Sequence, residues 1–330
     1  MKFFLAFLVL LFLFAGCASK KKFEPEIDYK NINYTDYTQF YLIDSRIDGA
    51  TYEDGSIVAK SGFYEKIAQN KETLFINETD EKLLLSNKSE LIIVDKKDNS
   101  STIIQTAQRV VSANMQNGII SAVLADNTIA IYDEKSKDIL FKSKQKPTTA
   151  VTNKVAKPIF FDDLIIFPTL DGKIIVVDKE SKRELREFMV SSEKYFNNII
   201  FLKIIKDKII TATKNAIYII TPRDSHELKI ELNDIFADEN SIVAVATNGK
   251  VLELDFALST KNEIKFPFAG LISITQKDNK FYMLERSGFL IVLDRGFLEY
   301  SIYELRDNLE NHIFVDNEKI YYKKRFIKLP

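Results

Sequence analysis

The side chains that could catalyse a reaction or bind a metal are few and widely spaced in this sequence. His226 and His312 are the only two histidines, and neither has another histidine or a cysteine at ligand spacing. A zinc site takes three or four such ligands, so the sequence predicts none. The paired carboxylates Asp162-Asp163 suit glycoside hydrolysis in type, but they fall in a predicted turn. A Gly-x-Ser-x-Gly elbow is also missing. We therefore expect binding rather than catalysis, with no cofactor, and keep an enzyme as the weaker alternative.

The one cysteine lies where a lipid could be attached. A charged Met1-Lys2 is followed by an apolar run over 3–14, which is shorter than the ~20 residues that span a bilayer. This layout is typical of a secretory signal. The segment Phe14-Ala15-Gly16-Cys17 resembles the lipobox of bacterial lipoproteins, which implies cleavage between Gly16 and Cys17 and acylation of Cys17. An ordinary signal peptide, or an uncleaved anchor, is the alternative.

These features divide the chain into a signal peptide over 1–16, a lipidated polar tether over 17–33 and a folded domain over 34–330. The domain is long enough to bury its own core without disulfides. In lipoproteins of bacteria with two membranes, an Asp after the acylated cysteine commonly retains the protein at the inner membrane. Ala18 stands there, so the resemblance implies the periplasmic face of the outer membrane.

Charge argues against nucleic acid as a partner, and the partner we expect is a protein of the cell envelope. The 46 basic and 47 acidic residues nearly cancel, and both signs are interspersed along the chain. A nucleic-acid surface needs a basic surplus on one face. We therefore expect no nucleic-acid binding, and contact with the membrane only through the anchor.

The elements that position these residues follow from a repeat. A β-rich run that closes on an aspartate recurs about every 40 residues, and a degenerate copy at 217–221 fills the one long gap. A period of this length with several strands per unit is typical of propeller blades. The closing aspartates are Asp95, Asp133, Asp178, Asp255 and Asp294. Each precedes a polar turn, so we predict that its carboxylate accepts backbone N–H groups there, a structural role.

The residue pattern of the strands also indicates the architecture. Runs such as 174–177 and 290–293 do not alternate apolar and polar residues, so both of their faces must be covered. No sustained helical period lies between the strands, and radially stacked sheets cover one another. We predict an all-β propeller of four-stranded antiparallel blades, seven in number with eight as the alternative. A β-helix and a sandwich compete, but the period is too long for one and too regular for the other.

The unit over 157–178 resembles the repeat of pyrroloquinoline-quinone-type propellers, with a Pro-led strand, an Asp-Gly turn and a strand ending in Asp. Together with Cys17 and the missing catalytic residues, the chain is similar to the BamB family of outer-membrane lipoproteins. That resemblance implies a scaffold without cofactor in the β-barrel assembly machinery. The family's Arg-Gly contact motif is absent, and only Lys154 or Lys157 offers a cation beside the Pro-led strand.

Exposed aromatic side chains in loops would mark a protein-binding face. The candidates are Tyr195, Phe196, Phe266 and Phe268, with core or rim packing as the alternative. A second hypothesis is a ligand held in the central channel, which the aliphatic innermost strands disfavour. A quinone-dependent enzyme is the third, although the chain has no Trp on which to stack a quinone.

Overall fold

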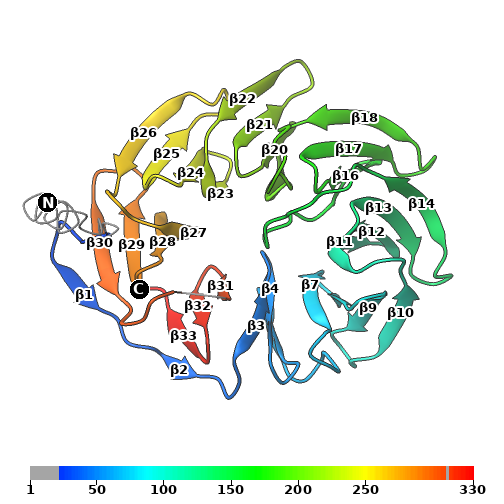
Figure 1. Cartoon of the computed structure of the whole chain (residues 1–330), viewed down its shortest axis with the longest axis horizontal. Helices are drawn as coiled ribbons and strands as arrows, with labels where there is room; N and C mark the ends of the chain where they lie inside the picture. The colour runs from blue at the N-terminus through cyan, green and yellow to red at the C-terminus, as the bar shows by residue number, and fades with distance from the viewer. Residues whose placement is uncertain (1–21, 310–311) are drawn as a thin grey trace, which may run out of the picture.

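The computed structural model describes residues 22–309 and 312–330, in which the regular structure consists of β-strands. The strands form eight sheets arranged around a central axis (Figure 1). The predicted all-β propeller is therefore confirmed, and the blade count is the alternative of eight. Gly16 and Cys17, the expected cleavage and lipidation positions, lie outside the described residues.

Each blade contains four antiparallel strands ordered from the axis outward, and one blade carries a fifth strand at its outer edge (Figure 1). Blades 1 to 4 each use four consecutive strands. Blade 1 contains β3 (Leu42–Ser45), β4 (Gly49–Tyr52), β5 (Ile57–Ala59) and β6 (Gly62–Tyr64). Blade 2 contains β7 (Leu74–Glu78), β8 (Lys82–Ser86), β9 (Glu90–Asp95) and β10 (Ser101–Gln105). Blade 3 contains β11 (Val110–Gln116), β12 (Ile119–Leu124), β13 (Thr128–Asp133) and β14 (Ile139–Lys144). Blade 4 contains β15 (Ile159–Phe161), β16 (Leu164–Pro168), β17 (Lys173–Asp178) and β18 (Glu184–Met189).

Blades 5 to 8 complete the ring, and the last two borrow strands from the N-terminal segment. Blade 5 contains β19 (Phe201–Ile205), β20 (Lys208–Ala212), β21 (Ala216–Ile220) and β22 (Ser225–Lys229). Blade 6 contains β23 (Leu232–Ala237), β24 (Ile242–Ala246), β25 (Lys250–Leu254) and β26 (Thr260–Lys265). Blade 7 contains β27 (Leu271–Lys277), β28 (Lys280–Glu285), β29 (Phe289–Asp294) and β30 (Tyr300–Glu304), with β1 (Tyr29–Asn31) added. Blade 8 contains β31 (Ile313–Val315), β32 (Lys319–Tyr322), β33 (Arg325–Lys328) and β2 (Asp36–Tyr37).

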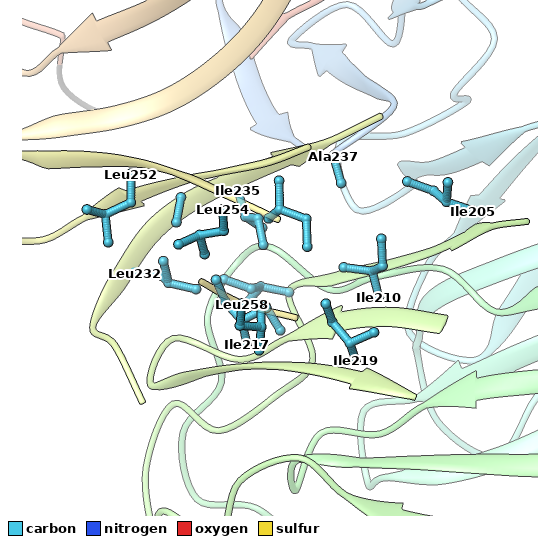
Figure 2. Packing of buried hydrophobic residues seen from close by; sticks show 14 residues of the cluster. Ile205, Ile210, Ile217, Ile219, Leu232, Ile235, Ala237, Leu252, Leu254 and Leu258 are labelled. Carbon is cyan, nitrogen blue, oxygen red and sulfur yellow. The ribbon is translucent and has the colours of Figure 1, made fainter. Parts of the chain in front are cut away.

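The core lies between neighbouring blades. Along the third strand β17 five consecutive residues are buried, whereas the outer strand β18 is mostly exposed. Between blades 5 and 6, Ile217 and Ile219 pack in one cluster with Ile235, Leu252 and Leu254 (Figure 2). Strands without alternation are covered on both faces by adjacent blades, which is why their apolar runs are continuous.

The aspartates that close the repeats bind the turns that follow them. Asp95 accepts the N–H of Lys97 at 2.8 Å, and Asp133 accepts that of Ser136 at 2.7 Å. The same bond recurs in three further blades, from Ser181 to Asp178, from Ala257 to Asp255 and from Leu298 to Asp294. These carboxylates satisfy backbone donors where the third strand turns into the fourth, which is an Asx-type turn.

The N-terminal segment closes the ring. Strand β2 pairs antiparallel with β33 at the outer edge of blade 8 (Figure 1). Beside it, Tyr34 donates a hydrogen bond to Asp307 at 2.6 Å, and Arg325 forms an ion pair with the same carboxylate at 2.8 Å. The Arg325 guanidinium also lies 4.3 Å from the centre of the Tyr34 ring. Burial and the Asp307 carboxylate raise the pKa of Tyr34 to about 12, so its hydroxyl stays a donor at neutral pH.

The folded part begins earlier than the expected boundary at residue 34. Strand β1 pairs in parallel with β30, and Phe23 is buried against Phe289 with ring centres 5.6 Å apart. The prediction of a polar tether through residue 33 is therefore wrong for residues 23–33. A parallel pairing gives no sequence signal of its own in a segment whose strand residues are all exposed. Strands β3 to β6, over residues 42–64, form blade 1, the unit that a count of seven blades leaves out.

A glycine between the second and third strands of a blade allows the next connection to approach. Gly249 has φ +80°, and a Cβ placed there would clash with the carbonyl oxygen of Phe266. Gly118 has φ +75°, but its Cβ would meet no atom within 4 Å. We expect Gly249→Ala to cost about 2–4 kcal/mol of unfolding free energy, and Gly118→Ala about 1 kcal/mol. Urea denaturation of both variants checks this; equal losses would contradict the steric argument.

Candidate functional site

Strand alternation places all inter-blade connections at one end of the propeller. The turns between second and third strands lie at that same end, because each strand reverses the direction of the one before it. We call this end the connection face. The turns between third and fourth strands, such as the one with Leu298, lie at the opposite end.

Tyr195 and Phe196 protrude from the connection face on a firmly held loop. Both residues are 51% exposed, and Phe196 has φ +51°, which is unusual for a bulky residue. The loop is fixed from below by two buried amides. Asn197 donates to the carbonyls of Asp171 and Ser191 at 3.0 and 2.8 Å. Asn198 donates to the carbonyl of Lys154 at 2.6 Å, in the connection between β14 and β15. The two aromatic rings are therefore presented by a preorganised support.

Phe266 and Phe268 differ in exposure: Phe268 lies at the surface and Phe266 is buried. Phe268 is 59% exposed and lines a cavity of about 410 Å³ on the connection face, together with Thr247, Asn248 and Pro267. Phe266 is 3% exposed and packs edge-to-face on Tyr300 at 5.2 Å. The prediction of Phe266 as a contact residue is thus wrong, because its side chain fills the space between blades 6 and 7. Phe268 shares the face of Tyr195 and Phe196 but lies two connections away.

Lys154 and Lys157 point inward and bind carboxylates of this chain, which corrects their prediction as free contact cations. Lys154 forms an ion pair with Asp234 of blade 6 at 2.9 Å. Lys157 forms one with Asp48 of blade 1 at 2.9 Å and also donates to Asn77 of blade 2 at 3.1 Å. The connection over 145–158 therefore ties blades together across the central channel.

Asp48 is a buried carboxylate that binds two partly exposed lysines. It receives a second cation, Lys60, at 2.5 Å. Burial acts to raise the pKa of Asp48, but the charges of Lys157 and Lys60 outweigh it and lower the pKa below the ordinary value. The carboxylate is therefore ionised at neutral pH and is fully committed to two lysines of the same chain.

A cavity of about 500 Å³ lies on the inner side of the ring. Its wall combines the β3–β4 region, the β14–β15 connection, β27 and the start of blade 8. It is lined by Ser45, Arg46, Ile47, Asn153, Lys154, Ile272, Ser273, Arg286, Leu309 and Ile313. We call this cavity the axial pocket. Its volume is in the range of small-molecule sites, which span about 300–1,000 Å³.

The residues with catalytic potential remain apart in the structure. Within residues 22–309 and 312–330, no group of three His, Cys, Asp or Glu side chains could hold a metal ion. His226 lies on the outer strand β22, and His312 precedes β31, in different blades. Asp162, at φ +49°, occupies the tight turn between β15 and β16, where its carbonyl accepts the Lys179 ammonium at 2.5 Å. In the same part of the chain, no helix is long and apolar enough to cross a membrane.

Several residues of these sites were missed by sequence reasoning. Asp48 and Asp234 accept the inward lysines, while Asn197 and Asn198 support the aromatic loop. Their partners come from other blades, and a repeat pattern contains no information about such pairs. The one available signal for these pairs was the connection over 145–158. It is long and polar and contains no regular turn, unlike a short link between two blades.

Comparison with known proteins supports the fold and offers two kinds of relative. No protein-family model matches the chain. Plasminogen-binding protein PgbB of Helicobacter pylori strain J99 is 26% identical over 382 aligned residues, which cover 98% of this chain and 70% of the relative. The protein of strain 26695 gives the same identity and coverage. Among solved structures, BamB from Moraxella catarrhalis has a TM-score of 0.70 at 14% identity, covering 90% of this chain and 99% of that one. At this identity the match with BamB shows a shared fold.

Proposed function

We propose that this chain is a protein-binding scaffold of the bacterial cell envelope and that its connection face contacts the partner. The observation that carries the proposal is the pair Tyr195 and Phe196, half exposed on a loop held by buried Asn197 and Asn198. Exposed aromatics dominate the binding energy of many interfaces, and a rigid support lowers the entropy cost of ordering them. The arrangement suits binding rather than catalysis.

The partner we propose first is a subunit of the outer-membrane barrel-assembly machinery. Its support is the BamB-like propeller together with the lipobox resemblance at Cys17. In the same proposal, Cys17 carries the lipid and holds the protein at the periplasmic face of the outer membrane. The scaffold has no cofactor and acts through its surface.

A second candidate partner is plasminogen, which the name of the Helicobacter pylori relatives specifies for those proteins. The observation that favours it is the similarity over nearly the whole chain. The two candidates require different locations, since plasminogen reaches only a protein exposed at the cell surface. Protease treatment of intact cells distinguishes the two locations.

The double variant Tyr195→Ser/Phe196→Ser is expected to bind the partner roughly 10-fold more weakly or worse. Truncation of an aromatic side chain at the centre of an interface typically costs more than about 1–2 kcal/mol of binding free energy. The full-length chain, purified in detergent from its own envelope, is used for crosslinking and mass spectrometry and for titration with purified plasminogen. Leu298→Ser is the matched control, because Leu298 is 86% exposed at the opposite end.

The two partner arms and the control give separate outcomes. Recovery of barrel-assembly subunits that disappears in the double variant supports the first partner, and saturable plasminogen binding with the same loss supports the second. Equal binding by the wild type and the double variant would remove the connection face from the proposal. Loss of binding in Leu298→Ser would show that the opposite end is the contact surface.

A further inference from the structure

The axial pocket combines positive charge with apolar walls. Arg46, Lys154 and Arg286 line it, and Ile272, Leu309 and Ile313 form much of the remaining surface. Two of the three cations are already neutralised. Arg46 is paired with Asp44 at 2.7 Å and Lys154 with Asp234 at 2.9 Å.

The third lining cation, Arg286, and a nearby cation outside the lining, Lys214, are not neutralised in this way. Lys214, in the turn between β20 and β21, is close enough to Lys154 and Arg286 for their charges to act on it. Among the described residues, no carboxylate lies within 4.0 Å of the Lys214 ammonium or the Arg286 guanidinium. The carboxylate of the neighbouring Glu285 acts on Arg286, but its oxygens are held by the N–H groups of Gly270 and Ser287.

Like charges act on the Lys214 ammonium. Burial lowers its pKa, and the charges of Lys154 and Arg286 lower it further. A bound anion would reverse this, because an opposite charge within a few ångströms favours the charged form. An anion between these cations would therefore reduce their mutual repulsion.

One polar group of the pocket has no hydrogen bond. The hydroxyl of Ser273, a pocket-lining residue of β27, is buried and has no partner in the described structure. Buried hydroxyl groups are normally satisfied, so an orphan in a pocket wall is a feature that a ligand or ordered water would explain. This observation is independent of the cations.

We propose that the axial pocket binds a small organic anion, in which a carboxylate or phosphate group is joined to an apolar moiety of a few carbon atoms. Arg286 in the pocket wall pairs with the anionic group, the charge of the nearby Lys214 adds to its attraction, and Ile272, Leu309 and Ile313 cover the apolar part. The cations come from turns and connections rather than from the innermost strands, which explains why aliphatic inner strands are compatible with a ligand. The inference does not depend on the protein partner proposed above.

The test is isothermal titration of the full-length chain in detergent with four probes: hexanoate, hexyl phosphate, inorganic phosphate and hexylamine. We expect saturable binding of one equivalent of hexanoate or hexyl phosphate, and the stronger of the two identifies the anionic group. Inorganic phosphate is expected to bind at least about 10-fold more weakly, because burial of the apolar part is worth about 0.8 kcal/mol per CH₂. Hexylamine is expected not to bind, and detergent alone is the blank.

Variants locate the site. Lys214→Gln together with Arg286→Gln is expected to weaken the anionic probes at least about 10-fold, since charged hydrogen bonds are worth about 1.5–3 kcal/mol each. Lys229→Gln on the exposed outer strand β22 is the matched control and is expected to leave binding unchanged. A thermal melt of each variant verifies that it is folded.

The remaining outcomes would overturn the proposal. Absence of saturable binding by both hexanoate and hexyl phosphate excludes the ligand class. Unchanged binding in the Lys214/Arg286 variant places the ligand elsewhere. Equal affinity for inorganic phosphate and hexyl phosphate would show that the pocket does not bind the apolar part of the ligand. None of these results affects partner binding through Tyr195 and Phe196.

Discussion

Removal of residues 1–37 is expected to lower the free energy of unfolding by at least about 4 kcal/mol. The truncation deletes β1 and β2, exposes the edges of β30 and β33, and takes Phe23 out of the core. It also removes Tyr34, whose hydroxyl donates a 2.6 Å hydrogen bond to Asp307. Because the ring is closed by these contacts, we expect a broader unfolding transition and rapid proteolysis of blade 8.

The matched control starts the chain at residue 22, which retains every described contact. Urea denaturation and limited proteolysis compare the two truncations with the full-length chain. Asp307→Ala is a narrower variant that removes the shared acceptor of Tyr34 and Arg325. An unchanged denaturation midpoint after deletion of residues 1–37 would mean that the ring holds without β1 and β2.

Asp48→Ala is expected to destabilise the protein by about 2–3 kcal/mol at pH 7, because it removes the charged hydrogen bonds that a buried carboxylate accepts from two lysines. The change leaves Lys60 and Lys157 facing each other without a carboxylate. Asp207→Ala is the control, since Asp207 pairs with Lys208 at the surface, and exposed pairs contribute about 1 kcal/mol at most. Urea denaturation of both variants measures the difference.

The same cluster predicts a pH dependence. The pKa of Asp48 in the folded protein is lowered by its two lysines, despite burial, whereas an unfolded Asp titrates near about 3.9. The stabilisation is therefore present above that pH and is lost as the pH falls through the folded pKa. We expect the wild type to lose stability more steeply than Asp48→Ala between about pH 5 and pH 2. Parallel curves for the two proteins would contradict this assignment.

The fold could be predicted from the sequence where the repeat is regular. The strands that end at Asp95, Asp133 and Asp178 are regular enough to define blades, because each repeat unit packs in the same way between two neighbouring units. Blade 1 was missed as a unit because its strands are three or four residues long and β5 ends without the aspartate. Strand β2 has only two residues, too few for any pattern of alternation.

The functional surface was predictable only in part. Tyr195, Phe196 and Phe268 are exposed on one face, whereas Phe266 is buried, although both phenylalanines flank the same proline in sequence. Burial at a loop depends on the neighbouring blade, which local sequence does not specify. Arg286 and Lys214 belong to different blades, and only closure of the ring brings their charges close enough to act on each other.

Burial of Phe23 determines how far the propeller can move from a membrane. If Cys17 is acylated as proposed, five residues separate it from Phe23, the first buried side chain, and the six Cα–Cα steps between them reach about 20 Å at full extension. A tether running to residue 33 would have allowed more than about 50 Å. The ring is then confined to a thin zone above the bilayer, with the rim of blade 7 nearest the surface. Partners that project only a short distance from the membrane would meet it there, at a high effective concentration.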